Sequence, residues 1–143
     1  YHYFSSKDHL LAATLVQWTL DLRKQLERQP VQGDTVLERV LDLLRRTTSG
    51  MRRHDRLSAA IITGFTSPGE DVAACQFELH DVWSSYMLAA FDDDFDPSRR
   101  DKIIRTLEHV LYSGLVGWTF GWVTLDQAVS ELEDAARLLL EDR

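Results

Sequence analysis

The sequence has almost no cysteine, and it lacks any apolar run long enough to cross a membrane. Cys75 is the only cysteine among 143 residues, which excludes an intrachain disulfide, a cysteine-based zinc cluster and a redox pair. A membrane-spanning helix needs roughly 18 consecutive apolar residues, and a secretory signal needs a basic start followed by an apolar stretch. Neither pattern is present. We therefore expect a cytoplasmic protein without membrane contacts, and a Cys75 that is buried as a small core residue.

Positive charge is also scarce. The 23 acidic residues outnumber the 16 lysines and arginines, and the formal net charge is −7. Because contacts with phosphates need clustered basic residues, this segment is not expected to bind nucleic acid through its bulk charge. The local exception is a group of five arginines within a dozen residues, which is interpreted mainly as solvated helix ends. These are Arg45, Arg46, Arg52, Arg53 and Arg56.

No residue pattern typical of an active site is present. The five histidines form no Glu-x-x-His or His-Glu-x-x-His pair, the spacings that place metal ligands on one helical face. A catalytic triad and a phosphate-binding glycine loop are missing as well. We therefore predict no catalytic residue, no metal and no cofactor, and a helical-bundle enzyme is only a remote alternative.

Helical spacing and helix-capping residues dominate the sequence. Apolar residues recur every three or four positions, and capping residues, proline or glycine stand between these stretches. Capping boxes are predicted at Ser67 with Glu70 and at Thr124 with Gln127. The predicted helices run from Ser6 to 29, Asp34 to 50, Asp55 to Phe65, Ser67 to Ala90, Asp96 to Trp122 and Thr124 to Leu139. Six helices with short connections predict one all-α bundle.

The opening residues YHYFSSKDHLLAATL resemble the end of the helix-turn-helix in TetR-family transcriptional regulators. In that family, an aromatic-rich end of the recognition helix is followed by Phe, a short turn, Lys and an apolar helix start. Ser5 stands where the family usually has proline. The matching residues are Tyr1, Tyr3, Phe4, Lys7, Leu10 and Leu11.

This resemblance implies a division of the chain. Residues 1–5 would be the remnant of a DNA-binding domain, and residues 6–143 an effector-binding and dimerisation domain. The resemblance also implies that Tyr1, Tyr3 and Lys7 contact the DNA backbone, which positions the protein without reading bases. Base reading would belong to an N-terminal domain that is missing here, so operator DNA is a partner only through that domain.

A narrower resemblance concerns the actinobacterial repressors of sterol and cholesterol breakdown within the TetR family. It is carried by the opening YHYFSSKDHLLAA and by DRLSAAIITGF, VWSSYMLAAF and LDQAVSELEDAARLLLED. Those repressors bind coenzyme A thioesters of steroid intermediates, which release them from DNA. The resemblance therefore implies a hydrophobic small-molecule effector, either a steroid or an acyl-CoA thioester.

The last two helices are interpreted as the interface of a homodimer. Gly114, Gly117 and Gly121 lie along one helical face, where backbones approach closely. Each glycine costs about 1 kcal/mol of helix stability relative to alanine, so a packing partner is expected. The TetR resemblance implies that the partner is a second subunit; the alternative is a neighbouring helix of the same chain. The predicted interface comprises Leu111, Gly114, Leu115, Gly117, Trp118, Gly121, Trp122, Leu125, Leu132 and Leu139.

An effector pocket is predicted among the middle helices. Aromatic and methionine side chains at helical spacing usually fill a core, but they also line small-molecule sites, and the family places its cavity here. The pocket candidates are Trp18, Phe65, Trp83, Tyr86, Met87 and Tyr112, with Arg52, Arg53 and Arg56 as possible contacts for an anion.

The predicted mechanism follows from this pocket. An effector that prefers a widened core would move helix 6–29, and with it the DNA-binding domains. The alternative is a dimerisation scaffold without effector, which predicts a filled interior.

Overall fold

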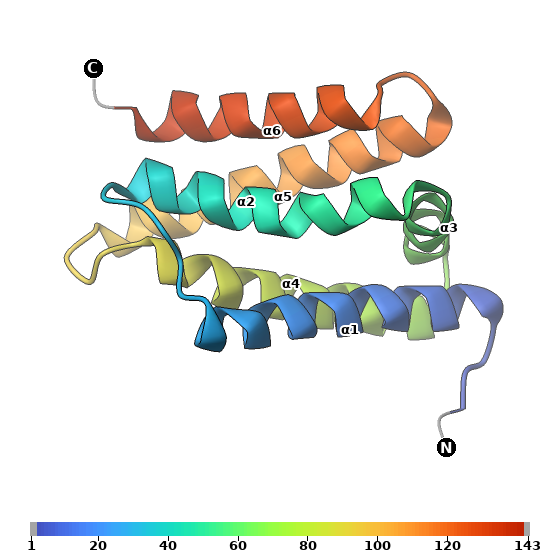
Figure 1. Ribbon diagram of the computed structural model, residues 1–143. Coiled ribbons are helices and arrows are strands. Elements are labelled where there is room, and N and C mark those ends of the chain that lie inside the picture. The colour runs from blue at the N-terminus through green and yellow to red at the C-terminus, as the bar shows by residue number, and fades with distance from the viewer. Residues whose placement is uncertain (1–2, 142–143) are drawn as a thin grey trace.

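The computed structural model describes residues 3–141, and in that range the chain is an all-α bundle without strands, as predicted. The helices are α1 (Lys7–Arg28), α2 (Val36–Arg53), α3 (Asp55–Phe65), α4 (Glu70–Met87), α5 (Pro97–Phe120) and α6 (Leu125–Leu140), with a 3-10 turn, η1 (Leu88–Ala90), after α4. Figure 1 shows α1 and α4 on one side of the bundle, α6 on the other, and α3 across one end. None of these helices is long and apolar enough to cross a membrane.

Three of the six helices begin at the predicted capping residues. The Ser6 hydroxyl accepts the first-turn N–H of His9 at 3.0 Å and starts α1. The capping box of α6 is confirmed, because Thr124 and Gln127 each accept the other's backbone N–H, at 3.0 and 2.8 Å. Asp96 caps α5 ahead of a proline in its first turn. The order of the elements therefore follows from local sequence signals.

Two predicted helix limits were wrong. α4 begins at Glu70 and not at Ser67, because Gly69 has a φ of +137°, and the Ser67 hydroxyl instead donates to the carbonyl of Thr63 at 3.1 Å. α2 continues past Gly50 to Arg53. One glycine inside a helix costs only about 1 kcal/mol, and burial of Met51 in the last turn offsets this cost.

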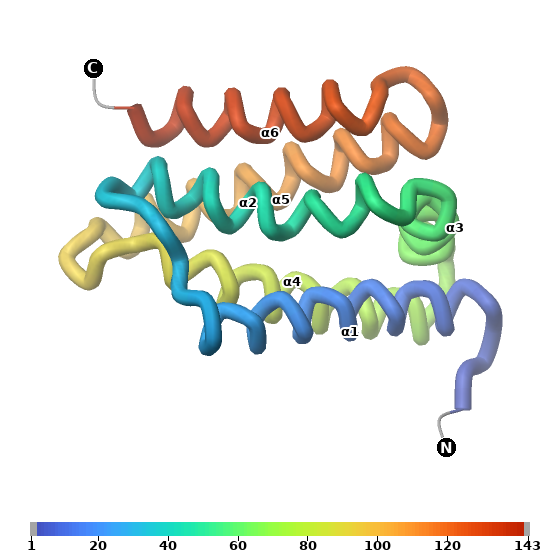
Figure 2. Tube along the Cα trace, viewed as in Figure 1, coloured from blue at the N-terminus to red at the C-terminus, as the bar shows by residue number. Residues whose placement is uncertain are grey.

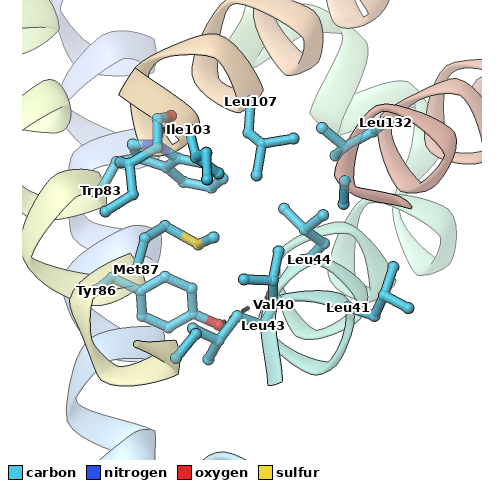
Figure 3. Packing of buried hydrophobic residues seen from close by; sticks show 13 residues of the cluster. Val40, Leu41, Leu43, Leu44, Trp83, Tyr86, Met87, Ile103, Leu107 and Leu132 are labelled. Carbon is cyan, nitrogen blue, oxygen red and sulfur yellow. Dashed lines mark hydrogen bonds between the residues drawn. The ribbon is translucent and has the colours of Figure 1, made fainter. Parts of the chain in front are cut away.

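The interior is divided into two clusters. The first, here called the α6-side core, joins α2, α4, α5 and α6 and is drawn in Figure 3. Its buried members are Val40, Leu41, Leu43, Leu44, Trp83, Tyr86, Met87, Ala90, Ile103, Ile104, Leu107, Leu132 and Ala136. The second, the α1-side core, joins α1 and α3 to parts of α2, α4 and α5. Its buried members are Ala12, Leu15, Val16, Met51, Ile61, Ile62, Phe65, Val72, Cys75 and Leu115.

The N-terminal end of α1 is held firmly against its neighbours. A side chain at Gly64 of α3 would come within 2.7 Å of the Cβ of Leu11, so the two helices touch there through backbone and Cβ. The Ser5 hydroxyl donates to the carboxylate of Asp71, in the first turn of α4. Figure 2 shows that the chain enters at this end of the bundle and that α6 finishes at the opposite end. Any domain that precedes residue 3 therefore attaches beside the α1-side core.

Candidate functional site

A cavity of about 250 Å³, here called the inner cavity, borders the α1-side core. The helices α1 to α5 all contribute to its wall, which is mostly apolar. The lining residues are Leu15, Thr19, Thr47, Met51, Ile62, Phe65, Gln76, Leu79, His80, Trp83, Glu108, His109, Leu111, Tyr112 and Leu115. A space of this composition accepts an apolar molecule that carries few polar groups.

Most polar side chains of the inner cavity lie on α4 and α5. His80 Nδ1 lies 2.8 and 2.9 Å from the two carboxylate oxygens of Glu108, which joins the two helices at the exposed edge. The amide nitrogen of Gln76 donates to the carbonyl of Phe65 at 2.7 Å. A ligand therefore meets an apolar wall with hydrogen-bonding groups mainly on α4 and α5.

A larger space of about 640 Å³, here called the outer cleft, lies between α1 and α2. Its floor contains Leu15, Trp18, Leu22 and Met51, whereas its other lining residues are mostly polar or charged. These are Thr19, Asp21, Lys24, Gln25, Arg28, Gln29, Arg46, Thr47, Ser49, Gly50, Arg53 and His54. The outer cleft thus differs chemically from the inner cavity.

Four residues line both spaces and form the wall between them: Leu15, Thr19, Thr47 and Met51. The hydroxyls of Thr19 and Thr47 donate to backbone carbonyls one turn earlier in their own helices, at 3.0 and 2.8 Å. The wall therefore consists of side chains from two helices, α1 and α2, whose threonine hydroxyls are bonded within their own helices. Movement of α1 away from α2 would change both spaces.

The predicted pocket residues fall into three groups. Phe65, Trp83 and Tyr112 line the inner cavity, and Trp18 lines the outer cleft. Tyr86 and Met87 line neither space, which corrects their assignment to a pocket. The sequence pattern could not separate them from Trp83, because residues three and four apart share one helical face.

Tyr86 has a structural role in the α6-side core. Its side chain is fully buried, and its hydroxyl donates to the carbonyl of Leu43 at 3.2 Å, the contact drawn as a dashed line in Figure 3. Burial raises the pKa of Tyr86 above its ordinary value. The phenol therefore stays neutral and links α4 to α2.

The three candidate arginines do not act together. Arg53 lines the outer cleft, whereas Arg52 forms an ion pair with Asp126 of α6 at 3.3 Å, and Arg56 lines neither space. Sequence reasoning missed Lys24 and Arg28, which line the cleft from α1. Their signal was present, because the two residues lie four positions apart and therefore share one face of that helix.

Sequence reasoning also missed the pair formed by His80 and Glu108. Only metal-ligand spacings within one helix were considered for the histidines. His80 and Glu108 instead lie on two different helices and are 28 positions apart in the sequence. No group of three or more potential metal ligands occurs in residues 3–141.

Cys75 is buried, as predicted, and burial, with nearby Glu78 and Asp71, raises the pKa of its thiol.

Two of the three glycines make the expected close approaches within the chain, as the alternative to a dimer interface predicts. A Cβ at Gly114 would lie 3.1 Å from the Cβ of Ala128 in α6, and one at Gly117 would lie 2.7 Å from the Trp122 ring. Gly121 ends α5 in the left-handed conformation, with φ +83°. The neighbours that Gly114 and Gly117 accommodate therefore belong to the same chain, whereas nothing lies within 4 Å of a Cβ at Gly121.

The other predicted interface residues are placed differently from one another. Leu132 is fully buried in the α6-side core, and Leu115 lines the inner cavity. Trp122 is 63% exposed. The remaining members, Leu111, Trp118, Leu125 and Leu139, are partly buried. The surface of α5 and α6 also exposes Phe120 and Leu138, each to 78%, which the sequence prediction did not include.

The residues predicted to contact DNA lie at the attachment end of the bundle. Tyr3 is 85% exposed, and Lys7 is exposed in the first turn of α1. Tyr1 lies outside the described residues. Their contact with DNA stays a prediction.

A protein-family profile and several known proteins match this chain. The profile of a protein family described as "Tetracyclin repressor-like, C-terminal domain" matches residues 33–139. The chain is similar to "HTH-type transcriptional repressor KstR" of Mycobacterium tuberculosis, with 23% identity over 100% of this chain and 65% of that protein. Proteins of the same name in Mycolicibacterium smegmatis and Rhodococcus jostii are 24% and 26% identical, over 98% and 99% of this chain and 69% and 66% of theirs. The chain thus spans about two thirds of the length of these relatives.

The fold is also similar to that of a solved structure, a TetR transcriptional regulator from Rhodococcus sp. RHA1. The TM-score is 0.79 at 22% identity, over 98% of this chain and 75% of that one.

Proposed function

The chain belongs to the TetR family of transcriptional regulators, whose C-terminal domain it contains, and from this we propose that it is the effector-sensing and dimerising part of a ligand-responsive repressor. The curated relatives are named as repressors, and both the family and those relatives are regulators and not enzymes. In this proposal, residues 6–143 bind the effector, and a DNA-binding domain precedes them in the longer protein.

The observation that carries the proposal is the inner cavity. A dimerisation scaffold without effector would have a filled interior, whereas here about 250 Å³ are open between five helices. Phe65, Trp83 and Tyr112 give its wall large aromatic surfaces. An uncharged hydrophobic body fits this wall, and a hydroxyl or carbonyl oxygen fits the edge where Gln76 and His80 lie.

We propose a steroid or an acyl-CoA thioester as the effector class, in keeping with the resemblance to repressors of sterol breakdown. The inner cavity is slightly smaller than the roughly 300 Å³ at which ligand pockets usually begin. A ligand with several fused rings therefore has to push the wall outward. Its affinity then differs between a narrow and a widened core, which is the condition for a ligand to shift a conformational equilibrium.

The widened core would act on α1. Leu15 and Thr19 of α1 form part of the wall, and the outer cleft separates much of this helix from α2. The same helix begins at Lys7, next to the attachment point of the DNA-binding domain. Movement of α1 in each subunit would change the distance between the two DNA-binding domains and lower operator affinity.

A homodimer would form through the outward surface of α5 and α6. Phe120, Trp122 and Leu138 are exposed there. Burial of apolar surface contributes about 25 cal/mol per Å², and a two-fold interface would use each of these residues twice. Tyr3 and Lys7 are proposed to contact the operator backbone together with the N-terminal domain.

The test uses the full-length protein and its operator. Operator binding is followed by fluorescence anisotropy while cholest-4-en-3-one, a coenzyme A thioester of a steroid acid, or palmitoyl-CoA is added. We expect one of these ligands to release the protein, and we expect Leu79→Trp, which fills the inner cavity, to bind the operator normally but to resist release. The control variant is Met87→Leu, outside both spaces, which should respond like the wild type.

Two results would contradict the proposal. Equal release of wild type and Leu79→Trp would show that the effector binds elsewhere. No change of operator affinity with any ligand, together with no ligand-induced rise of the melting temperature, would favour the scaffold.

A further inference from the structure

The outer cleft is strongly basic in a chain that is acidic overall. Four of its lining residues carry positive charge, Lys24, Arg28, Arg46 and Arg53, and one, Asp21, carries negative charge, whereas the whole chain has a formal net charge of −7. The lining thus has three more positive than negative groups. Such a local reversal of sign attracts an anion to this face of the bundle.

Three of the four cations are available to a ligand. Arg46 is already engaged, by Asp42 at 2.9 Å and by the carbonyl of Pro30 at 3.0 Å. Within residues 3–141, Lys24, Arg28 and Arg53 make no ion pair of 4.0 Å or less. The neighbouring Arg52 does, because it reaches Asp126 of α6. Lys24, Arg28 and Arg53 therefore remain unpaired in the cleft, whereas Arg52, which lies outside the cleft, is paired with a carboxylate.

Below these cations the cleft is apolar. Trp18 and Leu22 of α1 and Met51 of α2 contribute to its floor, and its volume of about 640 Å³ lies in the usual range for small-molecule sites. A bare inorganic anion would leave this floor in contact with water. A neutral apolar molecule would leave the cations without a partner. The combination fits a ligand that has both an anionic group and an apolar body.

We propose that the cleft between α1 and α2 binds an anionic amphiphile, a carboxylate or phosphate carried on an apolar chain. Lys24, Arg28 and Arg53 hold the anionic group, and arginine suits it because its guanidinium binds carboxylate or phosphate oxygens in pairs. The apolar chain lies along Trp18 and Met51. This site goes beyond the proposed function, which places the effector in the inner cavity, and its binding test does not depend on operator release.

The experiment measures binding of sodium decanoate, below its micelle concentration, to the full chain by isothermal titration calorimetry. Decanol has the apolar chain without a charge, and inorganic phosphate is an anion without an apolar chain. We expect decanoate to bind at least tenfold more tightly than either of these two compounds. Its affinity should fall when salt is raised, because the anionic contact is partly solvent-exposed.

Matched variants locate the site. Arg53→Gln should weaken decanoate binding about tenfold, whereas Arg52→Gln, one residue away and equally charged, should leave it unchanged. Leu79→Trp, which fills the inner cavity, should also leave it unchanged. Trp18→Phe should remove the decanoate-induced change in tryptophan fluorescence, although three other tryptophans remain. Circular dichroism verifies that each variant is folded.

Four results would overturn the proposal. Equal losses in Arg52→Gln and Arg53→Gln would show attraction by general charge only. Loss of binding in Leu79→Trp but not in Arg53→Gln would assign decanoate to the inner cavity. Phosphate binding as tight as decanoate binding would reveal a simple anion site. No decanoate binding at all would leave the cleft without the proposed ligand class, while the operator-release test of the inner cavity would remain valid.

Discussion

In the α6-side core, four helices converge on Leu107 and Leu132, both fully buried, and Figure 3 shows side chains of this cluster pointing into one shared interior. In the α1-side core, the helices instead surround the inner cavity, and the outer cleft lies on the far side of one wall. Both regions are built from leucine, isoleucine, methionine and aromatic residues. The comparison teaches that the same residue types can either fill a core or line a cavity in one fold.

Three helices, α2, α4 and α5, contribute to both regions. α2 contributes Val40 and Leu43 to the α6-side core with its first half, and Met51 to the wall of both spaces with its second half. α4 runs in the reverse sense, from Leu79 at the inner cavity to Met87 in the α6-side core. The filled core and the cavity are therefore connected by continuous helices.

The largest expected effect compares two leucines on α5. Leu107→Ala should lower the free energy of unfolding by about 4 kcal/mol, because it leaves a new cavity in a filled core. Leu111→Ala, one turn later at the inner cavity, should cost only about 1.5 kcal/mol, because Leu111 is partly buried and already lacks neighbours on the cavity side. Urea denaturation measures both. Equal losses would mean that the two regions are packed alike.

A larger side chain should also affect the two regions differently, because only the inner cavity has room for it. Leu43→Phe places a larger side chain in the α6-side core and should cost about 2 kcal/mol, whereas Leu79→Phe has the inner cavity beside it and should change stability by less than about 0.5 kcal/mol. Thermal unfolding at one protein concentration compares the pair. If Leu79→Phe destabilises as much as Leu43→Phe, the inner cavity is not open in solution.

The smallest expected effect concerns the Tyr86 hydroxyl. Tyr86→Phe removes its hydrogen bond to Leu43 and should cost about 1 kcal/mol at pH 7. Because burial raises the pKa of Tyr86 in the folded chain, the unfolded chain ionises first as pH rises. The stabilising contribution of the neutral phenol is therefore complete below about pH 10 and is lost as pH rises through the folded-state pKa.

The measurement is the free energy of unfolding at pH 7 and at pH 10.5. Stability of the wild type should fall between these values by more than that of Tyr86→Phe. The control is Leu107→Ala, which removes no titratable group and should show the wild-type dependence on pH. A parallel decline in all three proteins would assign the alkaline loss to other groups.

The sequence was a good guide to the helices because their ends depend on local signals. Ser6, Asp96 and Thr124 cap helices by contacts within three residues, and such contacts are readable from spacing alone. The start of α4 was misplaced because the φ of Gly69 overrides the capping signal of Ser67.

The candidate site was less predictable because it depends on the distance between helices. Arg52 and Arg53 are neighbours with the same charge, yet one faces α6 and the other the outer cleft, which follows only from how α2 is packed. Trp83 and Tyr86 share a helical face, yet only one borders the inner cavity. The sequence could name aromatic candidates, but it contained no signal for where the helices would separate.

The tight turn after α5 has an optical consequence. Gly121 reverses the chain, and Trp122 folds back over Gly117 with most of its indole ring in solvent, whereas Trp83 is almost completely enclosed. The two indoles therefore emit from environments of opposite polarity within one spectrum. If a second copy of the chain covers this turn, dilution below the dissociation constant of the dimer exposes Trp122 and shifts its emission to longer wavelength. The emission of Trp83 stays unchanged, so that tryptophan fluorescence measures dimerisation without an added label.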